Sequence, residues 1–160
     1  TAKTSVYIKT GGQFRRYERD DLYEDYTAFT TRGTVSSQIR KDLSLKLTFM
    51  KGAIESTYQD NAYFDLKYAD FELVKNLTGK LSLTTGGTLG RNDYPKNSDE
   101  GSFGVRARMD YIWGIRGGLT YQLVRGFDSG LMYELRGRDS NFKKYDYRDN
   151  RVMANVRASY

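Results

Sequence analysis

Polar and apolar residues alternate strictly along one long segment, from residue 103 to residue 123. Every second residue there is apolar, aromatic or small, and most of the residues between them are polar or glycine. A repeat of two places successive side chains on opposite faces of a β-strand, whereas an amphipathic helix would mix these faces within one turn. The segment is therefore predicted to be a strand with one apolar face, formed by Phe103, Val105, Ala107, Met109, Tyr111, Trp113, Ile115, Gly117, Leu119, Tyr121 and Leu123.

The same alternation recurs in four other parts of the chain, at residues 43–49, 77–89, 127–135 and 152–160. Short and long connections separate such runs in regular succession. Tight turns are predicted at 40–42, 74–76 and 124–126, and longer polar loops at 19–25, 57–61, 92–101 and 140–147. Helix has almost no place in this pattern, so the fold class is predicted to be all-β and antiparallel.

Three details of the pattern are less regular. The apolar positions change parity near Ala69, which indicates a bulge or a misassigned face. A turn at Trp113 and Gly114 would divide the longest strand, but it would break the succession of short and long connections. The only proline, Pro95, falls in a predicted loop. We therefore expect one domain, 1–160, with about eight strands at 4–18, 26–40, 43–56, 62–74, 77–91, 102–123, 127–139 and 148–160.

The length and spacing of these strands are typical of an up-and-down transmembrane β-barrel. Such barrels have short periplasmic turns, longer extracellular loops, and tilted strands that need about 9–11 residues to cross the hydrocarbon. Only one face of each strand must then be apolar, which accounts for the low mean hydropathy of a chain with 14% aromatic residues. A soluble barrel or sandwich with an apolar core is the alternative.

The end of the sequence, GLTYQLVRGFDSGLMYELRGRDSNFKKYDYRDNRVMANVRASY, combines several short motifs. It resembles the end of the bacterial outer-membrane β-barrel proteins, a porin family, that are found with exopolysaccharide-export systems. Those barrels are mostly larger, so the chain resembles either a short member or the last eight strands of one. The resemblance implies a barrel in the bacterial outer membrane, and its matching residues are Tyr121, Leu123, Arg125, Tyr133, Arg138 to Asn141, Tyr147 and Asn150 to Val152.

The last predicted strand has apolar residues at alternate positions and ends in an aromatic residue. This pattern resembles the C-terminal β-signal that the outer-membrane assembly machinery recognises. The resemblance implies that machinery as a partner, together with the lipid bilayer, lipopolysaccharide and other envelope proteins. The signal residues would be Val152, Ala154, Val156, Ala158 and Tyr160.

The polar faces of the predicted strands carry many charged residues, and cations outnumber carboxylates there about three to one. One interpretation is a pore that attracts anions. The favoured interpretation is a plugged lumen in which arginines pair with Asp110 and Glu134, because eight strands leave little room beyond the side chains. In this assignment Lys67 and Asp65 also face the lumen. The residues predicted to line or plug it are Lys46, Lys80, Arg106, Arg108, Asp110, Arg116, Glu134, Arg136 and Arg157.

The composition argues against catalysis, cofactors and nucleic acid. The chain has no His and no Cys, which removes the commonest general base, the thiolate nucleophile and the usual zinc ligands. A carboxylate pair for glycoside chemistry remains conceivable at Asp110 and Glu134, but no dedicated cleft is visible. The basic residues are spread over the strands instead of forming one patch, so no nucleic acid is expected.

The sequence therefore predicts a non-enzymatic outer-membrane barrel without a cofactor. The leading hypothesis is a structural or envelope-complex component with a largely plugged, basic lumen. The alternative is a narrow porin or export channel for small or anionic solutes. Lys143 and Lys144, in a predicted outer loop, are candidates for contact with lipopolysaccharide phosphates.

Overall fold

The predicted alternation of strands and connections is present in the computed structural model, which describes residues 3–16, 25–56, 63–99 and 105–159. One short 3₁₀ helix, η2 (Lys143–Tyr145), interrupts the strand pattern. No helix in the described ranges has the length and apolar character needed to span a membrane. The strands are β1 (Lys3–Arg15), β2 (Tyr26–Arg40), β3 (Leu43–Glu55), β4 (Tyr63–Asn76), β5 (Leu81–Asp99), β6 (Val105–Val124), β7 (Phe127–Ser140) and β8 (Tyr147–Ala158).

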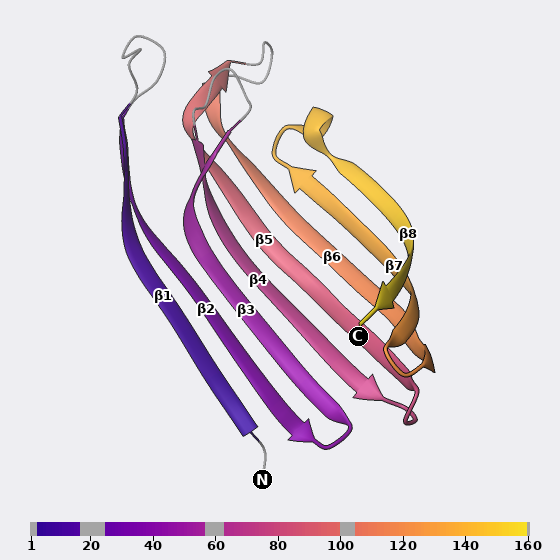
Figure 1. Ribbon diagram of the computed structural model, residues 1–160. Helices are drawn as coiled ribbons and strands as arrows, with labels where there is room; N and C mark the ends of the chain where they lie inside the picture. The colour runs from indigo at the N-terminus through magenta and orange to yellow at the C-terminus, as the bar shows by residue number, and fades with distance from the viewer. Residues whose placement is uncertain (1–2, 17–24, 57–62, 100–104, 160) are drawn as a thin grey trace.

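All eight strands belong to one antiparallel sheet in the order β1 to β8, so each strand pairs with its neighbours in the sequence. Figure 1 shows them side by side as a single curved and tilted layer, with β1 at one edge and β8 at the other. Within the described residues these two edge strands do not pair with each other. An even number of strands makes β1 and β8 antiparallel, so joining the edges would keep the up-and-down order around a barrel.

Two predicted boundaries were wrong. The predicted loop 92–101 is largely strand, because β5 continues through Pro95 to Asp99. The pairing of β5 with β6 shifts between Asp93 and Asn97, and such an irregularity accommodates a residue that has no N–H to donate. Leu77, predicted to start a strand, instead lies in the turn between β4 and β5. The prediction of one undivided strand through Trp113 is confirmed, since β6 pairs without a break on both sides there.

The strand register separates a polar face from a face that is apolar over most of its length. One row of paired residues runs through Val35, Leu47, Phe71, Gly87 and Ile115, and the next row runs through Thr34, Thr48, Asp70, Thr88 and Gly114. We call the first the outer face and the second the inner face. Large apolar side chains on the outer face are exposed, such as Leu89 at 68%. Exposed apolar side chains on one face are what a strand needs in order to contact lipid.

Candidate functional site

The inner face carries most of the charged residues that sequence analysis singled out. Lys46, Arg108, Asp110, Arg116, Glu134, Arg136 and Arg157 all share its parity in the strand register. Lys80 lies in the turn between β4 and β5, at the short-turn end of this face. Arg106 pairs in register with Ser98, beyond Arg108, and its side chain lies outside the described part of the molecule.

Arg116 forms a bidentate ion pair in the middle of the inner face. Its Nη1 and Nη2 atoms lie 2.8 and 2.9 Å from the two carboxylate oxygens of Asp70, two strands away. Thr88 donates a hydrogen bond of 2.7 Å to the same carboxylate, and Glu72 lies 3.5 Å from Arg116 Nη2. Gly86 leaves room for this arrangement, since a Cβ there would lie 2.8 Å from the guanidinium. The ion pair therefore ties β4 to β6 across the intervening β5.

A second ion-pair group lies on β7 and β8. Asp149 accepts hydrogen bonds from Arg136 Nε at 3.0 Å and from Arg151 Nε at 2.9 Å. Sequence analysis did not assign Asp70, Glu72 or Asp149 to the inner face, although their parity in the strands was a usable signal. With these carboxylates included, the excess of cations on the inner face is smaller than the predicted three to one. Glu134 lies opposite Arg116 and Arg151 in register, whereas these arginines reach Asp70 and Asp149.

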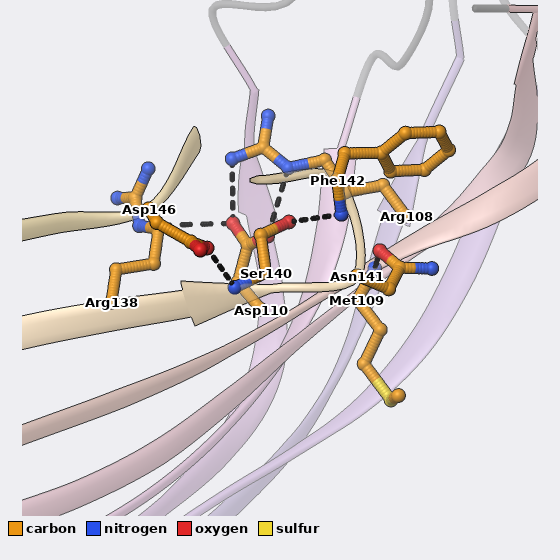
Figure 2. A network of polar contacts seen from close by, with 8 residues as sticks. All are labelled: Arg108, Met109, Asp110, Arg138, Ser140, Asn141, Phe142 and Asp146. Atoms are coloured by element: carbon orange, nitrogen blue, oxygen red, sulfur yellow. Dashed lines mark hydrogen bonds and ion pairs between the residues drawn. The ribbon is translucent and has the colours of Figure 1, made fainter. Parts of the chain in front are cut away.

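The most buried charges lie toward the long-connection end of the sheet (Figure 2). Asp110 is completely buried, and Arg108 is 3% exposed and donates two hydrogen bonds to it, at 2.9 and 2.6 Å. Arg138 Nε lies 3.7 Å from the same carboxylate. The guanidinium of Arg108 also stacks between two rings, 3.6 Å from the centre of Tyr145 and 4.6 Å from that of Tyr94. We call these five residues the Asp110 cluster.

The connection between β7 and β8 is fastened against the end of β6 next to this cluster. Asn141 accepts a hydrogen bond from the backbone N–H of Met109 at 2.8 Å and donates one to the carbonyl of Ala107, also at 2.8 Å. Its own backbone N–H bonds to the Met109 carbonyl at 3.0 Å. Asp146 accepts a hydrogen bond from the Ser140 N–H at 2.6 Å. Figure 2 shows Met109, Ser140, Asn141 and Asp146 beside Asp110, so the ordered connection and the buried charges form one unit.

The short-turn end of the inner face is open and polar. One hollow of about 360 Å³ is lined by four serines, with Gln38, Glu72, Lys3 and Lys46, together with Leu45 and Val74. A second, of about 420 Å³, is lined by Ser82, Thr84, Thr120, Gln122, Lys80, Asp128 and Arg157, together with Val74 and Gly79. Hydroxyl and amide groups with a few cations can hold water and small anions, so this end differs in character from the Asp110 cluster.

The assignment of Lys67 and Asp65 to the lumen was wrong. The pairing of β3 with β4 runs without a shift through Ala69, so neither a bulge nor a change of face occurs there. Lys67 is paired with Lys51 and shares its face with Phe71, which places it on the outer face. The error arose because the outer face becomes charged toward the long-connection end, and parity of apolar residues alone does not reveal such a boundary.

The proposed assembly-signal residues lie on the edge strand β8. Val152, Ala154, Val156 and Ala158 pair in register with Tyr133, Leu131, Ser129 and Phe127 and share the outer face. Val152 is 71% exposed and Val156 is 66% exposed. Tyr160, the aromatic end of the pattern, lies outside the described residues.

In the described ranges no group of three or more acidic side chains converges to hold a metal ion. Comparison with known proteins gives one family. The family model described as Putative beta-barrel porin 2 matches residues 8–160, which include most of β1 and all of β2 to β8. No curated protein and no solved structure matches the chain. The match agrees with the eight antiparallel strands and with the all-β membrane barrel predicted from the sequence.

Proposed function

Because the chain belongs to this family of β-barrel porins, we propose that it forms the wall of an outer-membrane channel for small anionic solutes. The observation that carries the proposal is the pair of open, polar hollows at the short-turn end of the inner face. Lys46, Lys80 and Arg157 line them, and a lining with more cations than carboxylates concentrates anions. This function was the alternative in the sequence analysis, and the open hollows favour it over a lumen plugged along its whole length.

The Asp110 cluster supplies the narrow part of the proposed channel. Its Arg108 and Asp110 are buried and paired with each other, and the β7–β8 connection is held beside them by Asn141. Solute would therefore meet an open vestibule at one end and a closely packed constriction at the other. An ion-paired constriction restricts passage to small solutes, since neither its arginines nor its carboxylate can move aside without leaving a partner buried and unpaired.

The same cluster favours a second candidate, a structural barrel or envelope-complex component that conducts nothing. In that role the inner face would serve to join strands, as the Arg116 to Asp70 pair does between β4 and β6. Both candidates are non-enzymatic, because the chain offers no His or Cys and its inner arginines engage the nearby carboxylates. In both, the membrane and the assembly machinery are the proposed partners, the latter through the apolar residues of β8.

Planar-bilayer recording of the folded chain separates the two candidates. We expect discrete conductance steps and a reversal potential in a salt gradient that shows preference for anions. Replacement of both Lys46 and Arg157 by Glu should reverse this preference, whereas Lys51→Glu on the outer face is the matched control and should not. A folded chain that inserts, as judged by heat-modifiable migration in detergent gels, but never conducts would refute the channel and leave the structural role.

A further inference from the structure

The outer face has three successive layers toward the long-connection end. The first is the apolar belt, which on β5 runs from Leu81 to Leu89 and so matches the roughly 9–11 residues that a tilted strand needs to cross hydrocarbon. The second, one register row further, is a line of cations on three adjacent strands, in which Lys51 pairs with Lys67 and Lys67 with Arg91. The third contains carboxylates, with Asp65 opposite Asp93.

Aromatic side chains mark the boundary between the belt and the cations. Trp113 lies in the last apolar row, opposite Leu89, and its Nε1 donates a hydrogen bond of 2.9 Å to Asp139. Tyr111 lies in the cationic row, opposite Arg91. Tryptophan and tyrosine are enriched where hydrocarbon meets headgroups, because one part of each ring is apolar and the other is polar. The cations therefore lie at the level of lipid headgroups.

A groove of about 390 Å³ enters the apolar belt directly below these cations. Small residues, Ala69 and Gly87, lie among the residues that line it, and larger ones surround them: Leu47, Phe49, Phe71, Leu89, Trp113 and Ile115. Ala69 and Leu89 are each two residues from a cation along their strands, Lys67 and Arg91. A narrow apolar groove that ends at a cationic row has the shape and polarity of a lipid molecule, with an acyl chain below and an anionic headgroup above.

On β3, β4 and β5 the row consists of cations only. Like charges directly opposite each other on neighbouring strands are destabilising, and here three cations stand in line. Asp93 accepts from both Lys67 Nζ at 3.1 Å and Arg91 Nε at 2.6 Å, so one carboxylate serves two cations. With Asp65 also counted, these three cations face two carboxylates on β4 and β5, and the carboxylate of Asp139 lies in the same row on β7, where it accepts from Trp113. The side chains of Lys67 and Arg91 remain 54% and 42% exposed, so an incoming phosphate can reach them.

We propose that the outer face holds a phosphate-bearing acylated lipid of the lipid A class, with one acyl chain in the groove beside Trp113 and a phosphate on Lys67 and Arg91. This inference rests on the proposed outer-membrane location, in which long connections face outward. It specifies the predicted contact with lipopolysaccharide and moves it from Lys143 and Lys144 to the wall of the sheet. Phosphate joins the cations that Asp93 only partly neutralises, while the groove receives hydrocarbon that would otherwise leave a void against the wall.

Trp113 is the only tryptophan of the chain and lines the groove, so it reports occupancy directly. The chain is reconstituted in bilayers of phosphatidylcholine with brominated acyl chains, which quench nearby tryptophan. Unlabelled lipid A is then added, with unlabelled phosphatidylcholine as the dilution control at equal acyl-chain content. We expect lipid A to restore Trp113 fluorescence at a mole fraction about fivefold or more below that needed with unlabelled phosphatidylcholine. A factor of about five is the gain in affinity for anionic lipid that one cation near a membrane surface contributes.

Two variants and one control locate the effect. Replacement of Lys67 and Arg91 by Gln should abolish the preference for lipid A while quenching by brominated lipid persists. Ala69→Leu should weaken the preference by filling the groove without removing a charge. The control, Lys46→Gln with Lys80→Gln on the inner face, should retain it. Heat-modifiable migration verifies that each variant is folded.

Each alternative result has a distinct meaning. Equal recovery with lipid A and phosphatidylcholine would refute the lipid site and leave the channel proposal intact. Absence of quenching by any brominated lipid would show that Trp113 does not face hydrocarbon, which would refute the membrane location and the lipid site together. A preference that survives removal of both Lys67 and Arg91 would also refute the site as proposed.

Discussion

The two ends of the inner face use charged residues in opposite ways. At the long-connection end, Asp110 is completely buried and its partners Arg108 and Arg138 are held by aromatic rings and by an ordered connection. At the short-turn end, Lys46 and Arg157 are exposed and line open hollows. The charges at the long-connection end stabilise the fold, whereas those at the short-turn end are exposed and can contact solute. Substitutions of the same chemical kind should therefore have different effects at the two ends.

The largest difference is expected for two aspartates on this face. Asp110→Asn removes the charge that neutralises the buried guanidinium of Arg108, and removal of one partner from a buried ion pair costs about 3–5 kcal/mol. Asp128→Asn, opposite Arg157 at the open end, should cost less than about 1 kcal/mol, as for solvent-exposed pairs. Equilibrium unfolding by urea in detergent or bilayers measures both. Equal losses at the two positions would contradict the contrast between the ends.

A smaller loss is expected when the β7–β8 connection is released from β6. Asn141→Ala removes the side-chain acceptor for the Met109 N–H and the donor to the Ala107 carbonyl. The Met109 N–H is only part-buried and the bond to the Ala107 carbonyl is exposed, so the loss of each hydrogen bond should cost about 0.5–1.5 kcal/mol. Conductance should rise, because the connection beside the constriction would be less restrained. Asn155→Ala on β8, at the exposed edge of the sheet, is the control.

If Asn141→Ala lowers stability and leaves conductance unchanged, the connection supports the fold and takes no part in the constriction. If it changes neither, the two hydrogen bonds do not hold the connection in the membrane. Either result would contradict the inference, drawn from the contacts in Figure 2, that the ordered connection and the buried charges act as one unit.

Arg116 tests the middle of the inner face, between the two ends. Arg116→Lys keeps the charge but loses the fork that bonds both oxygens of Asp70, because an ammonium group binds as a point charge. The pair is only partly buried, so we expect a loss of about 1 kcal/mol in the free energy of unfolding. Arg136→Lys, at the more exposed pair with Asp149, should lose less. A larger loss for Arg136→Lys than for Arg116→Lys would show that solvent exposure does not determine how much these ion pairs contribute to stability.

Most of the fold was predictable from the sequence because it rests on a repeat of two. The predicted strand at 26–40 coincides with β2, and the strand expected near 127–139 is β7, Phe127–Ser140. The turn at 124–126 was recognisable from its glycine, and Gly126 does adopt a positive φ of 81°. The end of β5 was not predictable, since Pro95 and its polar neighbours have the composition of a loop and only pairing with β6 makes them strand.

The site was predictable only as a set of residues on one face. Parity placed Arg108, Asp110 and Arg116 on one face, as the strand register does, but it cannot tell which carboxylate an arginine selects. Arg116 bonds Asp70, 46 residues earlier in the chain, because Gly86 of the intervening β5 has no side chain to block the guanidinium. The outer-face cations were missed for another reason. Where the strand leaves the hydrocarbon, both faces become polar, and alternation no longer distinguishes inside from outside.

The smallest effect on stability and the clearest effect on function are expected at the open end. Lys46 and Arg157 are exposed, so replacing each by Gln should leave the urea midpoint almost unchanged. Anion preference in a salt gradient should nevertheless fall with each replacement, because both residues line the polar hollows through which we propose that solute passes. Arg108→Gln should show the reverse combination, a large loss of stability and little change in anion preference. Stability falls because the buried Asp110 loses its partner, and anion preference changes little because Asp110 already neutralises the charge of Arg108. A fall in selectivity at Arg108 equal to that at Lys46 would mean that the buried cluster, and not the vestibule, selects the ion.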